Sequence, residues 1–373
     1  MPRFSGAPSR VRRGLMGLAL LLGVGLGAQV ATAQEARAGW VFTSLPHADL
    51  WFHGMAVVDP IGPGPNPLYD PGYPNEIRRA KGGGGSPPTA LDTRLGYFRD
   101  QFQRDPAFEV LHFLPLYFPQ AGRAEFFSAL KILVQATEGI PRAPTSHTAF
   151  GLAAVGSVLT TRAQRAVLGE FISALEAEWD SFFGDFWRDG AVPREQTLAS
   201  LQQSWTAAFL PALGPFLDGV GMSGGVVALV PAIGVEGRIF NGTPQNSFDN
   251  VLMVSAPAGP ENGPEAVFSM LRELSFPLVR RVMDRTGGAA GNPDEEESLA
   301  ARAAIRSGAL ILHMYRPDDL VTYQRFFLSR AGRSAPTAEA MEGAFRDSFP
   351  LEADFVEALR EEILTTVTDG GIG

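Results

Sequence analysis

Apolar side chains recur at helical spacing over much of the chain after residue 91. The clearest stretch is 162–187, where large apolar residues follow the i, i+3, i+4 rhythm of a helix with one buried face. The same rhythm predicts further helices at 124–138, 148–158 and 194–217. An aromatic stripe of this kind is more typical of a packed core than of a ligand site, so we interpret residues 91–219 as a helical region.

The hydrophobic period changes after residue 219. Residues 224–240 contain short β-branched runs bounded by glycines and are interpreted as two strands, and residues 250–255 as a third. Helical spacing then returns, and helices are predicted at 264–285, 293–315, 318–331, 337–348 and 353–367. The pattern therefore predicts an α+β fold that is mainly α-helical, with a small sheet packed on helices.

The first residues have the pattern of a secretory signal peptide. Residues 1–33 hold four arginines before an apolar, leucine-rich stretch, and they end in the small-residue triplet Ala31-Thr32-Ala33. We therefore expect cleavage, a periplasmic or secreted mature protein, and no membrane span after cleavage. The alternative is an uncleaved membrane anchor.

Residues 34–90 are patterned less regularly. The apolar segment 34–58 is expected to form an opening helix or strand, and residues 59–90 are so rich in proline and glycine that we predict an irregular surface loop. The predicted organisation is a signal peptide (1–33), an N-terminal segment with a Gly/Pro-rich loop (34–90), a helical region (91–219), and a part with the sheet and the C-terminal helices (220–373).

Charge and cysteine content exclude several functions. Without the four arginines of residues 1–33, the chain keeps 27 basic residues against 40 acidic ones, a net charge of −13. Such an acidic chain is unsuited to binding nucleic acid or anionic lipid. The absence of cysteine excludes thiol catalysis, cysteine-ligated metals and disulfide bonds. The fold must therefore be stabilised by burial of its core.

The most distinctive acidic residue is Glu273, in the helix predicted at 264–285. The apolar stripe of this helix is formed by Val267, Leu271, Leu274, Leu278 and Val282. Glu273 lies beside that stripe, and Pro277 removes the N–H that would bond its carbonyl, so a local bend is expected. A partly buried carboxylate is costly unless it is paired, and we predict an ion pair with Arg272 or Arg302. The alternative is an edge glutamate with a purely structural ion pair.

The run LRELSFPLV at 271–279 resembles the H-E-L-S-H-P-L-V helix of exported bacterial zinc peptidases of the gluzincin type. The segments 226–243 and 250–257 resemble the sheet and the substrate-facing edge strand of those enzymes. Further along, residues 297–302 resemble the helix that supplies their third, glutamate ligand. The resemblance therefore implies a zincin-like core within residues 220–373.

The resemblance also implies roles for single residues. In these peptidases, two histidines one helical turn apart hold zinc and the glutamate between them is the general base. Glu273 stands in the place of that base, and Glu297, or its neighbour Glu296, in the place of the third ligand. Arg272 and Phe276 stand where the histidines would be, and neither side chain can ligate a metal ion.

The histidines do not restore a metal site in the sequence. His47, His53, His112 and His147 are scattered, with no two histidines three or four residues apart. His313 alone is expected near the cleft. We therefore predict that the protein binds no metal and no cofactor. Zinc is expected only if the protein has a different set of metal ligands. The candidate site comprises Glu273 as a vestigial base with Arg272, Glu297, Arg302 and His313 around it.

The sequence favours an exported, non-catalytic metallopeptidase homologue that binds a peptide or protein in a cleft along residues 250–255. Two alternatives remain open: an active hydrolase or peptidase with an unrecognised ligand set, and a structural envelope protein in which the cleft has filled in. Metal analysis of the purified protein separates the first hypothesis from the second. Neither the ligand nor the oligomeric state follows from the sequence.

Overall fold

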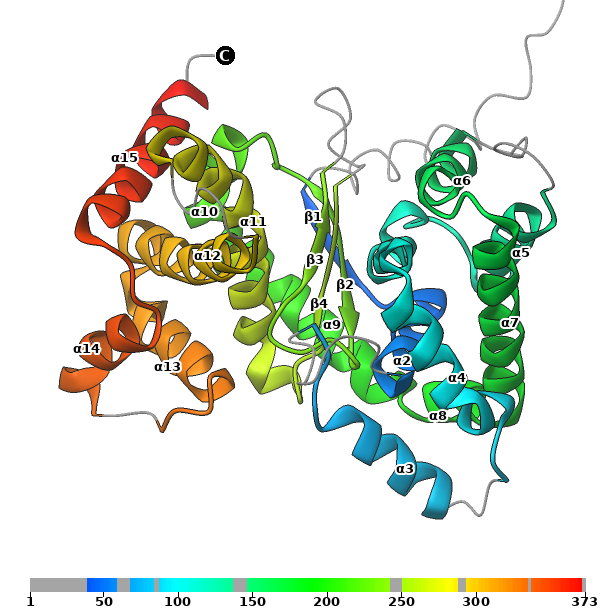
Figure 1. Ribbon diagram of the computed structural model, residues 1–373. Helices are drawn as coiled ribbons and strands as arrows, with labels where there is room; N and C mark the ends of the chain where they lie inside the picture. The colour runs from blue at the N-terminus through cyan, green and yellow to red at the C-terminus, as the bar shows by residue number, and fades with distance from the viewer. Residues whose placement is uncertain are drawn as a thin grey trace, which may run out of the picture. The chain divides into compact units, whose positions relative to one another are not determined.

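A four-stranded mixed sheet with helices on both faces forms the centre of the structure (Figure 1). The computed structural model describes residues 39–58, 68–83, 87–136, 146–241, 250–287, 293–334 and 337–370. These residues are mainly helical, which confirms the expected α+β class with a small sheet. The predicted signal peptide lies outside the described residues. Within them, no helix combines the length and apolar character needed to cross a bilayer.

The strand order of the sheet corrects one prediction. The strands lie in the order β1 (Trp40–Thr43), β2 (Gly225–Val230), β4 (Val251–Ser255) and β3 (Arg238–Phe240). β1, β2 and β4 are parallel, and β3 is antiparallel to β4. Met253 of β4 is paired on one side with Ala228 and on the other with Arg238. Residues 250–255 were therefore wrongly predicted as the edge strand, because among the described residues β4 lies between β2 and β3, and β3 is at the edge.

Alternating side chains of β2 and β4 divide the core into two parts. Ala228 and Val230 face one helical layer, whereas Val227 and Leu229 face the other. The first layer contains α2 (Pro46–Val58), α3 (Tyr73–Gly83), α4 (Ala90–Arg104), the 3-10 helices η1 (Pro106–His112) and η2 (Leu114–Tyr117), α5 (Arg123–Gln135), α6 (Ser146–Val158), α7 (Arg162–Glu178), the π-helical turn η3 (Trp179–Phe183) and α8 (Gly184–Asp189).

The second layer follows in sequence and covers the other face. It contains α9 (Ala191–Ser204), the π-helical turn η4 (Trp205–Phe209), α10 (Leu210–Gly219), the short 3-10 helix η6 (Pro260–Asn262), α11 (Gly263–Thr286), α12 (Pro293–Tyr315), the 3-10 helix η7 (Pro317–Asp319), α13 (Leu320–Arg330), α14 (Ala338–Ser348) and α15 (Ala353–Gly370). The helices predicted from periodicity on both sides of the sheet are thus present.

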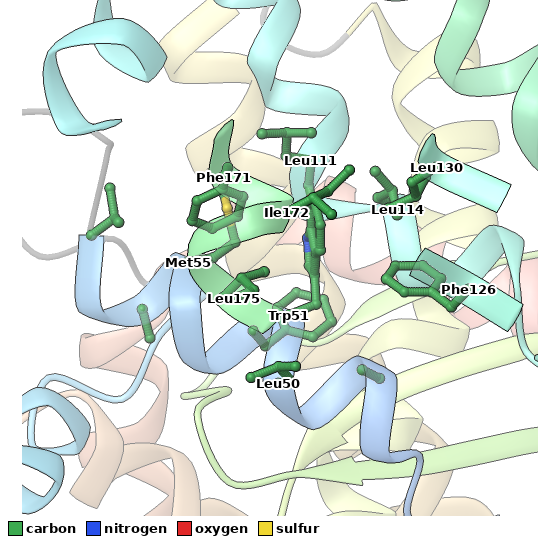
Figure 2. Close-up of a cluster of buried hydrophobic side chains, with 14 of the residues drawn as sticks. Leu50, Trp51, Met55, Leu111, Leu114, Phe126, Leu130, Phe171, Ile172 and Leu175 are labelled. Carbon is green, nitrogen blue, oxygen red and sulfur yellow. The ribbon is translucent and has the colours of Figure 1, made fainter. Parts of the chain in front are cut away.

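Trp51 of α2 lies at the centre of the first layer (Figure 2). Its ring is fully buried and makes edge contacts with Phe126 and Phe171, at centroid distances of 5.7 and 5.3 Å. Its indole N–H donates to the carbonyl of Leu111 over 2.8 Å, so the polar atom is satisfied inside the core. Through Trp51, helix α2 therefore packs the N-terminal part of the described chain against the long helix α7.

Helix α3 corrects a second prediction. The Gly/Pro-rich composition of residues 59–90 predicted an irregular loop, but Tyr73–Gly83 form a helix. Tyr73, Ile77 and Lys81 are spaced four residues apart and bury one face of it. Residues 59–67 and 84–86 lie outside the described part of the chain.

A buried polar cluster, which we call the α3 network, ties α3 to α2, α4 and α7. It comprises His53, Tyr73, Lys81, Thr89, Asp92 and Glu178. Lys81 Nζ lies 2.7 Å from Glu178 Oε1 and 2.8 Å from Asp92 Oδ1. His53 Nε2 lies 3.1 Å from the same Glu178 oxygen, and both of these side chains are completely buried. The network thus supplies α3 with attachments that its small apolar face does not.

The protonation states in the α3 network follow from its geometry. Burial lowers the pKa of His53, which favours a neutral ring that donates from Nε2 to Glu178 and accepts the Tyr73 hydroxyl at Nδ1. Burial alone would raise the pKa of Glu178. Hydrogen bonds from His53, Lys81 and Thr89 outweigh that cost and lower the pKa to about 2. Glu178 is therefore an ionised carboxylate inside the protein.

Candidate functional site

A pocket of about 500 Å³ lies beside the edge strand β3, between helices α11 and α12. Phe113, which joins η1 to η2, lines it from the opposite helical layer. Three arginines and four glutamates line the same pocket: Arg238, Arg272 and Arg280 with Glu236, Glu273, Glu296 and Glu297. The pocket thus has a dense set of charges, with one more carboxylate than guanidinium.

The structure brings together three of the five predicted site residues. Arg272, Glu273 and Glu297 line the pocket, as does Phe276. Arg302 does not line it and instead donates from Nη1 to Ser298 Oγ over 2.7 Å along its own helix. His313 is exposed near the end of α12 and is not part of the pocket. The structure therefore does not bring these two predicted residues to the pocket.

Helix α11 positions the floor of the pocket. Its apolar stripe is fully buried against the sheet and the neighbouring helices, which fixes the rotation of the helix about its axis. Arg272 and Phe276 are one turn apart and therefore reach the same pocket. The helix continues through Pro277 to Thr286 and ends at Gly287, whose φ of 68° is left-handed.

The guanidinium of Arg272 is the centre of what we call the pocket network. Arg272 Nη1 is paired with the Glu273 carboxylate, and Nη2 lies 3.0 Å from Glu236 Oε1. The Arg272 side chain is only 3 % exposed, and its Cζ lies 5.0 Å from the centre of the Phe276 ring. Burial opposes the charge, but the two carboxylates outweigh it and raise the pKa of Arg272. This confirms the predicted ion pair between Glu273 and Arg272.

Glu273 is held by the backbone as well as by Arg272. The N–H of Gly237 donates to Glu273 Oε1 over 2.8 Å. A Cβ atom at position 237 would come within 2.8 Å of Glu273 Cγ and of the Met253 carbonyl oxygen, so only glycine fits this approach. The carboxylate therefore ties the turn before β3 directly to helix α11.

Glu236 is a member of the site that the sequence reasoning missed. Its side chain is 20 % exposed, and its carboxylate contacts Arg272 and, at 3.5 Å, Arg238 Nη1. Arg238 in turn places its guanidinium 5.2 Å from the centre of the Phe113 ring. The sequence contains a signal for this position. Glu236 and Arg238 lie two residues apart at the start of a short apolar strand, and this spacing places two charges on one side of an extended chain.

The outer rim of the pocket is formed by α11 and α12. Arg280 Nη1 lies 2.6 Å from Glu296 Oε1, and both side chains are about half exposed. Glu297 is exposed and lies in no ion pair among the described residues. It is the carboxylate that the three arginines of the pocket leave without a partner.

The residues present do not fit a zinc ion. The Glu273 oxygen that would face the metal already accepts from Arg272 and Gly237, and a permanently charged guanidinium lies beside it. Phe276 has no donor atom. Across the part of the chain that the structure describes, no group of three or more histidine, aspartate or glutamate side chains is arranged to hold a metal ion.

The other histidines belong to the fold. His47, His53 and His112 are buried in the first helical layer, and burial lowers the pKa of each. The side chain of His147 lies outside the described residues. None of the described histidines reaches the pocket.

No family model, no curated protein and no solved structure matches this chain.

Proposed function

We propose that this chain is an exported, non-catalytic homologue of gluzincin-type metallopeptidases that binds a peptide or protein in the pocket beside β3. One observation carries the proposal: the Arg272 guanidinium is buried between Glu273 and Glu236 at the position where the resemblance would place a histidine ligand. An internal cation thus takes the place of the metal as the charge that neutralises these carboxylates.

The arrangement around Arg272 supports the resemblance. An antiparallel edge strand, the helix that carries the RELSF run, and a following helix with Glu296 and Glu297 all contribute to one pocket. The resemblance places the general base and the third ligand on these two helices, whereas the edge strand that it assigns to residues 250–257 is replaced by β3. Periplasmic or secreted localisation is part of the same proposal and rests on residues 1–33.

The chemistry of the pocket argues against metal-dependent hydrolysis. Zinc peptidases need three protein ligands and a metal-bound water whose pKa falls to about 7. Glu273, the residue in the place of the general base, is already engaged by Arg272 and by the Gly237 N–H. Arg272 stays protonated and cannot accept a proton from water. Binding without turnover is the function that these groups support.

The ligand is proposed to be a peptide because the pocket adjoins a strand edge. Among the described residues, β3 is hydrogen-bonded to β4 on one side only. An extended peptide can add to such an edge through main-chain hydrogen bonds, while neighbouring pockets take its side chains. Arg238 and Ile239 belong both to this strand and to the pocket lining.

Metal analysis of the purified protein and of one double variant tests the proposal. The native protein is expected to bind no stoichiometric zinc and to show no chelator-sensitive peptidase activity. Arg272→His with Phe276→His is expected to bind zinc, because two histidines one turn apart would then face Glu273, Glu296 and Glu297. The single variant Arg272→His is the matched control and should bind zinc far more weakly. Stoichiometric zinc in the native protein together with chelator-sensitive peptidase activity would instead establish an active hydrolase.

A further inference from the structure

The charges of the pocket are unevenly satisfied. Arg272 is paired with Glu273 and Glu236, Arg238 with Glu236, and Arg280 with Glu296. Each arginine is therefore already neutralised by a carboxylate of the same pocket, whereas Glu297 has no such partner among the described residues. An anionic ligand would have to displace a glutamate, but a cationic group finds an accessible carboxylate.

The arginines still have unused hydrogen-bond donors. The Nε–H groups of Arg238 and Arg272 are buried and have no acceptor among the described residues. These donors lie below the pocket surface, so a ligand can satisfy them only when the side chains around them move. Because the pocket already carries an excess negative charge, a neutral carbonyl oxygen suits these donors better than a second carboxylate. A peptide backbone supplies such oxygens.

An aromatic surface continues from the pocket along β3. Phe240 lies two residues after Arg238, so both side chains leave the same side of the strand. The Phe240 ring lies 5.7 Å from Tyr117 and 5.3 Å from Phe150, and we call these three residues the aromatic patch. Phe150 is 49 % exposed, and Phe113 at the pocket wall is 37 % exposed. Exposed rings next to a pocket are typical of an interaction surface.

We infer that the ligand of this pocket is an extended peptide with a lysine or arginine side chain directed at Glu297 and an apolar side chain directed at the aromatic patch. The inference rests on the proposed function and adds the class of peptide. It assigns Glu297 the selection of charge, and Phe150 with its neighbours the selection of an apolar residue.

Binding of labelled peptides to the full chain tests the inference. Three peptides of equal length would place lysine, acetyl-lysine or glutamate next to a phenylalanine, with binding followed by fluorescence anisotropy at low and high salt. The lysine peptide is expected to bind about tenfold more tightly than either of the others, with an advantage that shrinks in high salt. Phe150→Ser should weaken all three peptides without changing their order.

Charge reversal at one position gives the sharpest result. Glu297→Lys should reverse the preference from the lysine peptide to the glutamate peptide. Glu295→Lys is the matched control, because Glu295 is exposed on the same helix but does not line the pocket, and this change should leave the order as it is. Equal binding of all three peptides, or equal effects of the two lysine variants, would overturn the inference and leave peptide binding in place. Failure of every peptide to bind would overturn both this inference and the proposed function.

Discussion

The protein buries charge in two regions, and among the described residues only one of the two lines the pocket. The α3 network encloses Glu178 and His53 with no exposed surface, and no described residue of it lines the pocket. The pocket network buries Arg272 and Glu273 almost as deeply. Each network has one partly exposed carboxylate, Asp92 in the first and Glu236 in the second, but only the second network faces a pocket of about 500 Å³. One network holds helices together, whereas the other lines a pocket.

The comparison shows that a buried, perturbed ionisable group does not by itself mark a functional site. The lowered pKa values of Glu178 and His53 arise in a cluster whose purpose is to hold α3. Ion-pair networks that serve the fold perturb pKa values as strongly as active sites do. Access from a pocket, rather than depth of burial, distinguishes Arg272 and Glu273.

The largest effect is expected from Glu178→Gln. The change keeps the shape of the side chain but leaves Lys81 inside the protein with one carboxylate fewer, and breaking a buried ion pair costs about 3 kcal/mol or more. Urea unfolding at pH 7 measures the loss. Glu176→Gln is the control, because Glu176 pairs with Lys131 at the surface and should contribute less than about 1 kcal/mol. Equal losses of unfolding free energy in the two variants would show that the α3 network stabilises the fold no more than a surface ion pair does.

A smaller effect is expected from Arg272→Met. The change leaves Glu273 and Glu236 without their guanidinium, but the pocket admits water to hydrate the freed carboxylates. We expect a loss of about 1–2 kcal/mol, again by urea unfolding. Arg272→Lys keeps the charge but cannot bridge both carboxylates equally well, so it should fall between the native protein and Arg272→Met. A loss as large as that of Glu178→Gln would contradict the idea that the pocket lets water hydrate the freed carboxylates.

The smallest effect is expected from acid. Burial and the charge of Arg238 lower the pKa of His112 to about 3, from 6.5 in the unfolded chain. Between these values the unfolded chain binds a proton that the folded protein does not, so the stability from His112 is present above pH 6.5 and is lost as the pH falls. The loss between pH 7 and pH 6 is about 0.7 kcal/mol.

The variant His112→Asn isolates this contribution. It keeps a hydrogen-bond acceptor for Tyr69 but removes the titration, so its stability should depend less on pH than that of the native protein. Only the difference between the stability curves of the two proteins is diagnostic. Burial raises the pKa of Asp49 to about 6, so the contribution of Asp49 to stability changes with pH in the opposite direction to that of His112. Parallel curves would show that His112 accepts its proton in the folded state.

Local patterns in the sequence were sufficient to predict the second helical layer and part of the site. Periodicity placed α11 and α12, and the adjacent letters of RELSF placed the ion pair between Arg272 and Glu273. The pairings that involve distant residues were not predictable in this way. His53 meets Glu178 across 125 residues, and no local pattern connects them.

The misplaced elements have the same origin. Residues 250–255 have the composition of a strand, but only the pairing of β4 with both β2 and β3 shows that the strand is interior. Helix α3 was hidden by glycine and proline around it, although Tyr73 and Ile77 are spaced for one helical face. The composition around α3 indicated a loop and that of 250–255 indicated a strand, but only tertiary contacts determine that α3 is a packed helix and that β4 is an interior strand.

The first strand sets an order of events for folding. The β1 residue Trp40 donates its indole N–H to the carbonyl of Met222, 182 residues later, and β1 pairs in parallel with β2. A chain that emerges from the ribosome or from a membrane channel N-terminus first has no partner for β1 until most of its length has followed. The helices of the first layer can pack together before β2 has been made, but the sheet forms late. Closure across such a long separation is slow, so a newly made chain spends that interval with an unpaired apolar strand that needs protection from aggregation.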